Sequence, residues 1–167
     1  DPLMGAIADR TNTKMGKFRP YLLYTALPFG ILGFIMFITP DLSVQGKVIY
    51  AFITYNLMMM VYTVINVPYS ALMGVISPHS EERTVVSTFR FVAAFVGQFI
   101  VQFAVLRLVS VFGKGNEQIG WQWTMAVMAG LSVVLWLVTF ATTKERVKPV
   151  KGLKHPLKQD LADLLRN

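Results

Sequence analysis

The chain has 167 residues, of which 54% are hydrophobic and only 15% are charged, whereas an ordinary soluble domain carries roughly a quarter charged residues. A soluble protein of this length could not bury so much apolar surface, so the composition predicts a membrane protein. The net charge is +7, and the lack of cysteine excludes disulfides and thiolate metal sites. The basic residues lie in short segments between apolar stretches without an interleaved aromatic face, so nucleic-acid binding is not expected.

The apolar stretches predict membrane helices. Residues 1–8 are predicted to be the last turns of a helix cut at its beginning, because Asp1 stands in place of an initiator Met and no signal-peptide pattern follows. Four apolar segments come next, each long enough at about 1.5 Å per residue to cross the hydrocarbon layer. They cover residues 21–40, 48–80, 85–112 and 118–143. No alternation of period two is sustained, so an all-α membrane fold is predicted rather than a β-barrel.

The segments between the spans predict their orientation. Residues 9–20 hold four Lys or Arg and residues 144–167 hold seven, whereas 41–47 and 113–120 hold one each. Four spans separate the two basic segments, so both lie on one side, and the positive-inside rule makes that side cytoplasmic. The same parity makes residues 77–84 cytoplasmic.

The chain is therefore divided into a transmembrane bundle, residues 1–143, and a polar cytoplasmic tail, residues 144–167. After Pro156, which suits a first helical turn, the leucines of the tail follow the spacing of one helix face. They are Leu157, Leu161, Leu164 and Leu165. We expect this amphipathic helix to lie on the bundle or on the membrane surface.

Three polar residues lie inside the apolar spans at a similar depth. By helical rise, Asp1, Asn66 and Arg90 lie about 10–16 Å from the cytoplasmic ends of their helices. Because polar groups are costly in hydrocarbon, this slab is a candidate binding site. Alternatives stay open: Asp1 could be a frayed end, Asn66 could join two helices, and Arg90 could extend to the headgroups. Arg107, near the outer end of its span, is expected to reach the outer headgroups.

Two of the spans carry a stripe of polar and aromatic side chains. The stripe on residues 48–80 consists of Tyr55, Met59, Tyr62, Thr63, Asn66, Tyr69, Ser70 and Met73. The stripe on residues 85–112 consists of Ser87, Arg90, Gln98 and Gln102. Facing stripes of this kind suit a hydroxyl-rich solute, because amides and guanidinium groups hydrogen-bond hydroxyls and rings stack on sugar faces. Pro68 removes one backbone hydrogen bond beside Asn66, where a transporter binds and bends.

Catalytic machinery is not indicated. His79 and His155 lie in polar segments without acidic partners at useful spacing, and Glu81 and Glu82 are expected to be a solvated pair. No span carries a Ser/His, Asp/Asp or His-rich arrangement, so we expect neither an enzyme nor a bound cofactor or structural metal.

Several motifs, in order, carry a family resemblance. The first basic loop reads G-x-x-x-D-R at residues 5–10 and K-x-G-K-x-R-P at residues 14–20. This resembles the loop between helices two and three of the major facilitator superfamily. Further motifs are D-P-L-M-G at 1–5, Y-T-V-I-N-V-P-Y at 62–69, and E-R-T to F-R-F within 82–91. Together they are similar to the glycoside–pentoside–hexuronide:cation symporters, the family of melibiose permease.

The resemblance covers essentially the whole chain and implies its place in a transporter. It implies a fragment of the N-terminal six-helix half, from the end of helix two through helix six into the central cytoplasmic loop. It further implies symport of a sugar or glycoside with Na⁺, Li⁺ or H⁺ by alternating access, in a bacterial inner membrane. The alternatives are an uncoupled facilitator, a lipid or drug carrier of the same superfamily, or a sugar sensor that does not transport.

The resemblance also implies roles for matched positions, all of them named by their place in this sequence. The residues implied to bind the coupling cation are Asp1, Thr63 and Asn66. The residues implied to bind the sugar are Tyr62, Asn66, Ser70 and Arg90. The residues implied to form the cytoplasmic gate are Gly5, Asp9, Arg10, Gly16 and Arg19.

Two of these positions depart from the family pattern. Asn66 stands where melibiose permease has an acid shared between sugar and cation, and Ser70 stands where an aromatic residue packs on the sugar. Loss of the carboxylate removes a charge that helps to dehydrate Na⁺, which leaves the choice between Na⁺ and H⁺ open. The changed aromatic leaves the identity of the sugar open.

Overall fold

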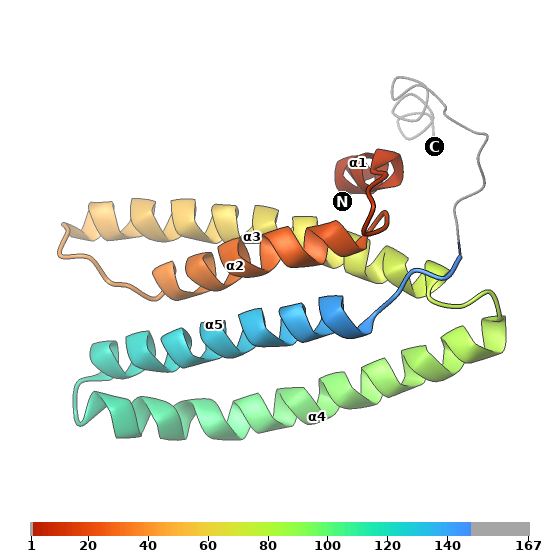
Figure 1. The fold of residues 1–167 in the computed structure, drawn as a ribbon. Helices are drawn as coiled ribbons and strands as arrows, with labels where there is room; N and C mark the ends of the chain where they lie inside the picture. Colours follow the sequence, from red (N-terminus) through yellow and green to blue (C-terminus); the bar gives the residue numbers. More distant parts are fainter. Residues whose placement is uncertain (1, 148–167) are drawn as a thin grey trace.

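The computed structural model describes residues 2–147 and contains five α-helices in that range (Figure 1). They are α1 (Pro2–Arg10), α2 (Arg19–Ile35), α3 (Val44–Val75), α4 (Ser80–Gly113) and α5 (Glu117–Thr142). An isolated bridge between Thr13 and Gly16 is the only strand-like pairing among these residues. Asp1 and the amphipathic helix predicted after Pro156 lie outside the described residues.

Three of the described helices, α3, α4 and α5, are long and apolar enough to cross a membrane. Only 11%, 6% and 6% of their most apolar windows are buried within the chain. Most of this apolar surface therefore faces outward, which suits hydrocarbon rather than water as the surrounding solvent. The prediction of an all-α membrane fold is confirmed.

Helix α2 is shorter than the span predicted at residues 21–40. It has 17 residues, about 25 Å at helical rise, which is the short end of the range for a membrane-crossing helix. After Ile35 the amides of Phe37 and Ile38 bond three residues back, which tightens the last turn and ends the helix. Pro40 favours extended backbone at the residue before it. That α2 crosses the membrane stays a prediction.

The four long helices lie side by side in one layer, in the order α3, α2, α5, α4 (Figure 1). Helix α2 packs between α3 and α5, and α4 packs on α5. Helices α3 and α4 therefore occupy opposite edges of the layer and approach each other only near the loop that joins them. Residues 11–18, 76–79 and 143–147 all lie at one end, where the predicted cytoplasmic segments belong (Figure 1).

The free backbone amides in the first turns of three helices find hydrogen-bond acceptors in two different ways. The Ser43 hydroxyl accepts a hydrogen bond from the Gly46 amide at the start of α3, and the Asn116 side chain accepts one from the Ile119 amide at the start of α5. Helix α2 is preceded by Phe18, which supplies no side-chain cap. Its first amides need an acceptor from another part of the chain.

A small buried cluster joins helices at the end predicted to be cytoplasmic. Its buried members come from α1, α3 and the start of α2: Met4, Ala8, Phe18, Leu22 and Leu72. Half-buried rings of α5, Trp136 and Phe140, pack against it. This cluster fixes the end of the layer at which the predicted gate and binding residues lie.

Close packing of α2 on α5 gives a first prediction. A Cβ added at Gly30 would clash with Cγ2 of Val133 and lie 3.2 Å from the carbonyl oxygen of Ala129, whereas nothing lies within 4 Å of a Cβ added at Gly33. We expect Gly30→Ala to lower the free energy of unfolding by about 1–3 kcal/mol through overpacking. Gly33→Ala should leave it unchanged or raise it by up to ~1 kcal/mol. Melting temperatures of the purified variants in detergent measure the difference, and equal values would contradict this packing.

Candidate functional site

An open cleft of about 450 Å³ lies between the end of α3 and the start of α4. Hydroxyl and guanidinium groups make up most of its described lining. The lining residues are Ser70, Met73, Gly74, Ser80, Arg83, Thr84, Ser87 and Arg90. These groups offer hydrogen-bond donors and acceptors in several directions, and no carboxylate is among the described lining residues.

The cleft brings together two of the predicted sugar-binding residues, Ser70 and Arg90. Tyr62, Thr63 and Asn66 lie further along the same helix and do not line it. Thr63 and Asn66 are half-buried, and Tyr62 is 44% exposed. No hydrogen bond among residues 2–147 uses the side-chain amide of Asn66. The amide therefore keeps its donors and its acceptor for other groups.

The two polar stripes meet only at the end of the layer that is predicted to be cytoplasmic. Away from that end, α2 and α5 lie between α3 and α4 (Figure 1). Gln98 and Gln102, on the outer half of α4, are exposed. The cleft is thus formed by the last turns of α3, from Ser70 to Gly74, and by the first turns of α4, from Ser80 to Arg90.

Aromatic rings hold Arg90 at the cleft. Its guanidinium carbon lies 5.2 Å from the ring centroid of Tyr69 and 5.7 Å from that of Phe91. The Tyr69 ring stands edge-on to Trp136 of α5 at 5.3 Å, and Trp136 in turn stands edge-on to Phe29 of α2 at 6.4 Å. Arg90 is half-buried. A cation packed on rings in this way is fixed by the bundle, which favours the binding interpretation over extension to the headgroups.

The loop below the cleft is tied together by polar contacts. The Ser77 hydroxyl donates to the Glu82 carboxylate, and it accepts a hydrogen bond from the His79 amide. One guanidinium nitrogen of Arg83 donates to the Ser77 carbonyl at 3.1 Å. The sequence predicts a solvated pair of Glu81 and Glu82. Glu82 differs from this prediction, because its carboxylate accepts the Ser77 hydrogen bond and belongs to the turn that leads into α4.

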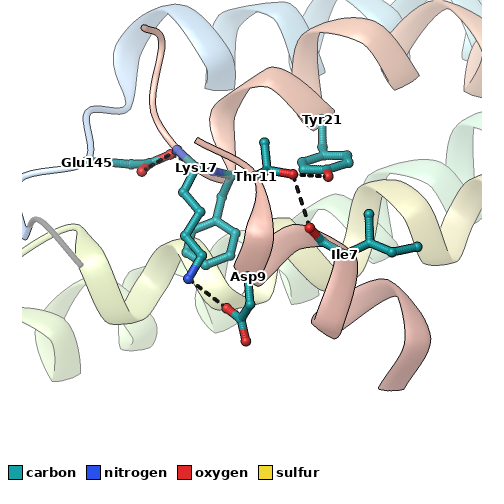
Figure 2. A network of polar contacts seen from close by, with 7 residues as sticks. Ile7, Asp9, Thr11, Lys17, Tyr21 and Glu145 are labelled. Atoms are coloured by element: carbon teal, nitrogen blue, oxygen red, sulfur yellow. Dashed lines mark hydrogen bonds and ion pairs between the residues drawn. The ribbon is translucent and has the colours of Figure 1, made fainter. Parts of the chain in front are cut away.

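The predicted gate segment, residues 9–20, is held by an ion pair and by hydroxyls (Figure 2). The Lys17 ammonium lies 2.8 Å from the Asp9 carboxylate and above the Phe18 ring. Thr11 shares a hydrogen bond with the Tyr21 hydroxyl and donates to the Ile7 carbonyl. Because the Asp9 side chain is 68% exposed, this ion pair contributes little stability, on the order of 0–1 kcal/mol.

The other gate residues are placed around the same segment. Gly5 lies on α1 with open space at its Cβ position, and Arg10 occupies the last turn of α1, where a cation complements the helix dipole. Gly16 has a positive φ of 116°, a conformation that favours glycine. Arg19 begins α2, donates to the Phe140 carbonyl at 2.8 Å, and stacks over the Phe140 ring.

Glu145 is the polar residue that the sequence prediction missed. Its carboxylate accepts hydrogen bonds from the backbone amides of Lys17, Phe18 and Arg19 at 2.8, 2.7 and 3.0 Å. Figure 2 shows its side chain directed at Lys17. A signal existed in the sequence, since the start of α2 has no Ser, Thr, Asp or Asn to cap it.

Two of the three predicted cation-binding residues lie on α3. Thr63 and Asn66 share one face of this helix, and Asp1 lies outside the described residues. Among residues 2–147 no cluster of three or more His, Cys, Asp or Glu side chains could hold a metal ion.

Comparison with known proteins gives one family and several relatives. The family described as MFS/sugar transport protein matches residues 1–167. A protein of Escherichia coli (strain K12) named as a candidate glycoside/cation symporter, YagG, is 48% identical over 95% of this chain and 35% of its own length. The inner membrane symporter YicJ of the same organism is 42% identical over 100% of this chain and 36% of its own. The isoprimeverose transporter of Lactiplantibacillus pentosus is 34% identical over 99% and 35%. The chain thus spans about a third of the length of these relatives.

The contact between Arg90 and Tyr69 gives a second prediction. Tyr69→Leu removes the ring that carries the guanidinium and packs on Trp136, so we expect the free energy of unfolding to fall by about 1–3 kcal/mol. Tyr69→Phe keeps the ring and should stay close to wild type. Thermal melting in detergent compares the two variants. Equal melting temperatures for the Phe and Leu variants would show that the ring does not hold this part of the bundle.

Proposed function

The chain belongs to the MFS/sugar transport family, and from this premise we propose that the full-length protein carries a sugar or glycoside across the membrane together with a coupling cation. Transport proceeds by alternating access, in which the binding cavity opens to one side of the membrane at a time. The names of the relatives support this substrate class, and their bacterial origin supports a bacterial inner membrane as the location.

The observation that carries the proposal is the hydroxyl- and guanidinium-lined cleft between α3 and α4. A guanidinium has five N–H donors and no acceptor, so it pairs with the hydroxyl oxygens of a sugar. The hydroxyls of Ser70 and Ser87 can both donate and accept. Tyr69 carries Arg90 on its ring, which holds the guanidinium in one direction without consuming its donors in a salt bridge. In this proposal Ser70 and Arg90 bind the sugar, and Tyr62 and Asn66 extend the site along α3.

The coupling cation is assigned to Asp1, Thr63 and Asn66. The carboxylate of Asp1 supplies the charge, and the hydroxyl of Thr63 and the carbonyl of Asn66 supply neutral oxygen ligands of the kind that Na⁺ accepts. An amide at residue 66 cannot take up a proton as a carboxylate can, so Asp1 is also the titratable group if the cation is H⁺. A cation that binds more tightly when the sugar is bound couples the two fluxes through a free energy shared by both sites.

The gate residues act at the cytoplasmic end of this path. Asp9 and Lys17 pair there, and Arg19 closes on the end of α5. The pair of Asp9 and Lys17 can break and reform as the cavity changes sides, because it is partly exposed and weak.

Asp1→Asn tests the cation assignment. The substitution keeps the size of the side chain but removes its charge, so we expect cation-dependent accumulation of sugar to be abolished in the full-length protein. Uptake driven by a Na⁺ or H⁺ gradient in membrane vesicles is the measurement. Asp41→Asn, an exposed acid in the loop between α2 and α3, is the matched control and should change nothing. Accumulation against a gradient that survives Asp1→Asn would rule out this role.

Arg90→Ala tests the sugar assignment. Loss of charge-assisted hydrogen bonds worth about 1.5–3 kcal/mol should weaken the binding of sugar by roughly 10- to 150-fold. Titration calorimetry with the transported sugar measures the dissociation constant. Arg107→Ala removes an exposed arginine from the outer part of the same helix and should leave affinity unchanged. An unaltered affinity in Arg90→Ala would mean that this guanidinium serves the headgroups rather than the substrate.

A further inference from the structure

We propose that Glu145 is a positioning residue that ties the gate segment to the wall of the substrate cleft, so that both move as one body during transport. This inference rests on the proposed function, because it assigns Glu145 to the transport cycle. The residue lies after the end of α5 and is far from the gate segment in sequence.

The first link joins Glu145 to the start of α2. Its carboxylate accepts three backbone hydrogen bonds, from the amides of residues 17, 18 and 19. These are the amides that a helix start leaves without partners, and Phe18 offers no side-chain cap of its own. A carboxylate also complements the positive end of the helix dipole, and hydrogen bonds to a charged acceptor are roughly twice as strong as neutral ones.

The second link runs in the opposite direction, from α2 to α5. The guanidinium of Arg19 donates to the Phe140 carbonyl at 2.8 Å and lies 4.7 Å from the Phe140 ring centroid. Phe140 belongs to the last turn of α5, where carbonyls lack helical partners and a cation complements the negative end of the dipole. The two helix ends thus exchange charged side chains: Glu145 binds the start of α2, and Arg19 binds the end of α5.

We call these contacts of Glu145 and Arg19 the clasp. The third link extends the clasp to α3. The amides of Arg146 and Val147 both donate to the carbonyl of Val75, at 2.9 and 3.0 Å. Val75 is the last residue of α3, and its neighbour Gly74 lines the substrate cleft. Residues 143–147 therefore attach to the gate segment through one side chain and to the cleft wall through two backbone amides.

Gly16 makes room for the clasp. A Cβ added there would lie 2.5 Å from Oε1 of Glu145, and φ at this residue is 116°. A side chain at residue 16 would clash with the Glu145 carboxylate, and the positive φ would strain the backbone as well. The gate segment is shaped around the carboxylate, which is a feature of a specific contact rather than of a charge on a surface.

Loss of the clasp should slow the conformational change of the transport cycle and leave the affinity for sugar nearly unchanged. The hydrogen bonds of the Glu145 carboxylate go to the gate segment and not to the cleft residues, so the sugar should still bind. The gate segment would no longer follow the movement of α3 and α5, and the step that changes the exposed side would slow. We therefore expect a loss of transport rate with little loss of affinity.

The experiment compares Glu145→Gln with Glu117→Gln in the full-length protein. Glu117 is exposed in the first turn of α5, at the other end of the helix, so its substitution removes the same charge without touching the clasp. For Glu145→Gln the maximal uptake rate should fall roughly fivefold or more, and the dissociation constant of the sugar should stay within about twofold. Glu117→Gln should behave as wild type. An unchanged rate, or a rate and an affinity that fall in parallel, would overturn the proposal.

Two further variants test whether one contact is responsible. Gly16→Ala crowds the same carboxylate and should give the same rate loss, and the double variant with Glu145→Gln should be no slower than either single one. Glu145→Asp keeps the charge one methylene further away and should recover part of the rate. If Glu145→Gln does not fold, Gly16→Ala and Glu145→Asp still decide the outcome, and wild-type rates in both would contradict the clasp.

A measurement that needs no substrate separates this inference from the proposed function. The chain has no cysteine, so spin labels can be placed at exposed Lys14 and Lys144, with cysteines elsewhere in the full-length protein replaced. Wild type should give a narrow distribution of distances that broadens in Glu145→Gln and not in Glu117→Gln. A narrow distribution in Glu145→Gln would overturn the clasp. If the wild type carries no sugar, the proposed function fails while the label distances still test the contact.

Discussion

The backbone amides at the start of α2 have no partner within their own helix, and the carboxylate of Glu145 satisfies them from the far end of the described chain. Because a buried helix start without acceptors is costly, this contact fixes where α2 begins and how it lies against α5. The position of α2 in turn places α3 and α5 on its two sides, and Trp136 of α5 then meets Tyr69 of α3. The contact of Glu145 with the start of α2 therefore contributes to the position of the Tyr69 ring, on which Arg90 packs.

The second constraint is the apolar outer surface. Helices α3, α4 and α5 bury little of their apolar surface in one another, so the layer is suited to lipid on much of its area. The polar contacts of the gate segment and the lining of the cleft lie at one end of the layer. Charged groups are costly in hydrocarbon, so a position near one end of the layer, at the membrane surface, suits the charged residues of the gate segment.

Much of this could be predicted from the sequence because it depends on local patterns. Of the four spans predicted from the length of the apolar segments, three are helices long and apolar enough to cross a membrane. Helical spacing correctly placed Ser70 and Arg90 on stripes that meet at one cleft. The end of α2 at Ile35 depended on a tightened turn that hydropathy does not register. That residues further along the stripes do not face each other follows from the order of the helices in the layer, which spacing within one helix cannot give.

Glu145 escaped prediction for a related reason. Its acceptor atoms and the amides that they bind are separated by 126 to 128 residues, and neither sequence segment alone forms a recognised capping motif. In a list of charges it is one acid in a basic tail. Separation in sequence, here 67 residues, also hides the contact between Tyr69 and Trp136, which supports the ring that Arg90 packs on.

The central claim is that the polar residues of α3 and α4 belong to a carrier that couples a sugar to a cation gradient. Uptake of a panel of labelled glycosides and uronides by the full-length protein in proteoliposomes, with and without Na⁺ and pH gradients, tests it most directly. We predict that at least one sugar accumulates above its external concentration, and only when a gradient is imposed. Uptake that ignores both gradients, or binding of sugar without any flux, would contradict the account.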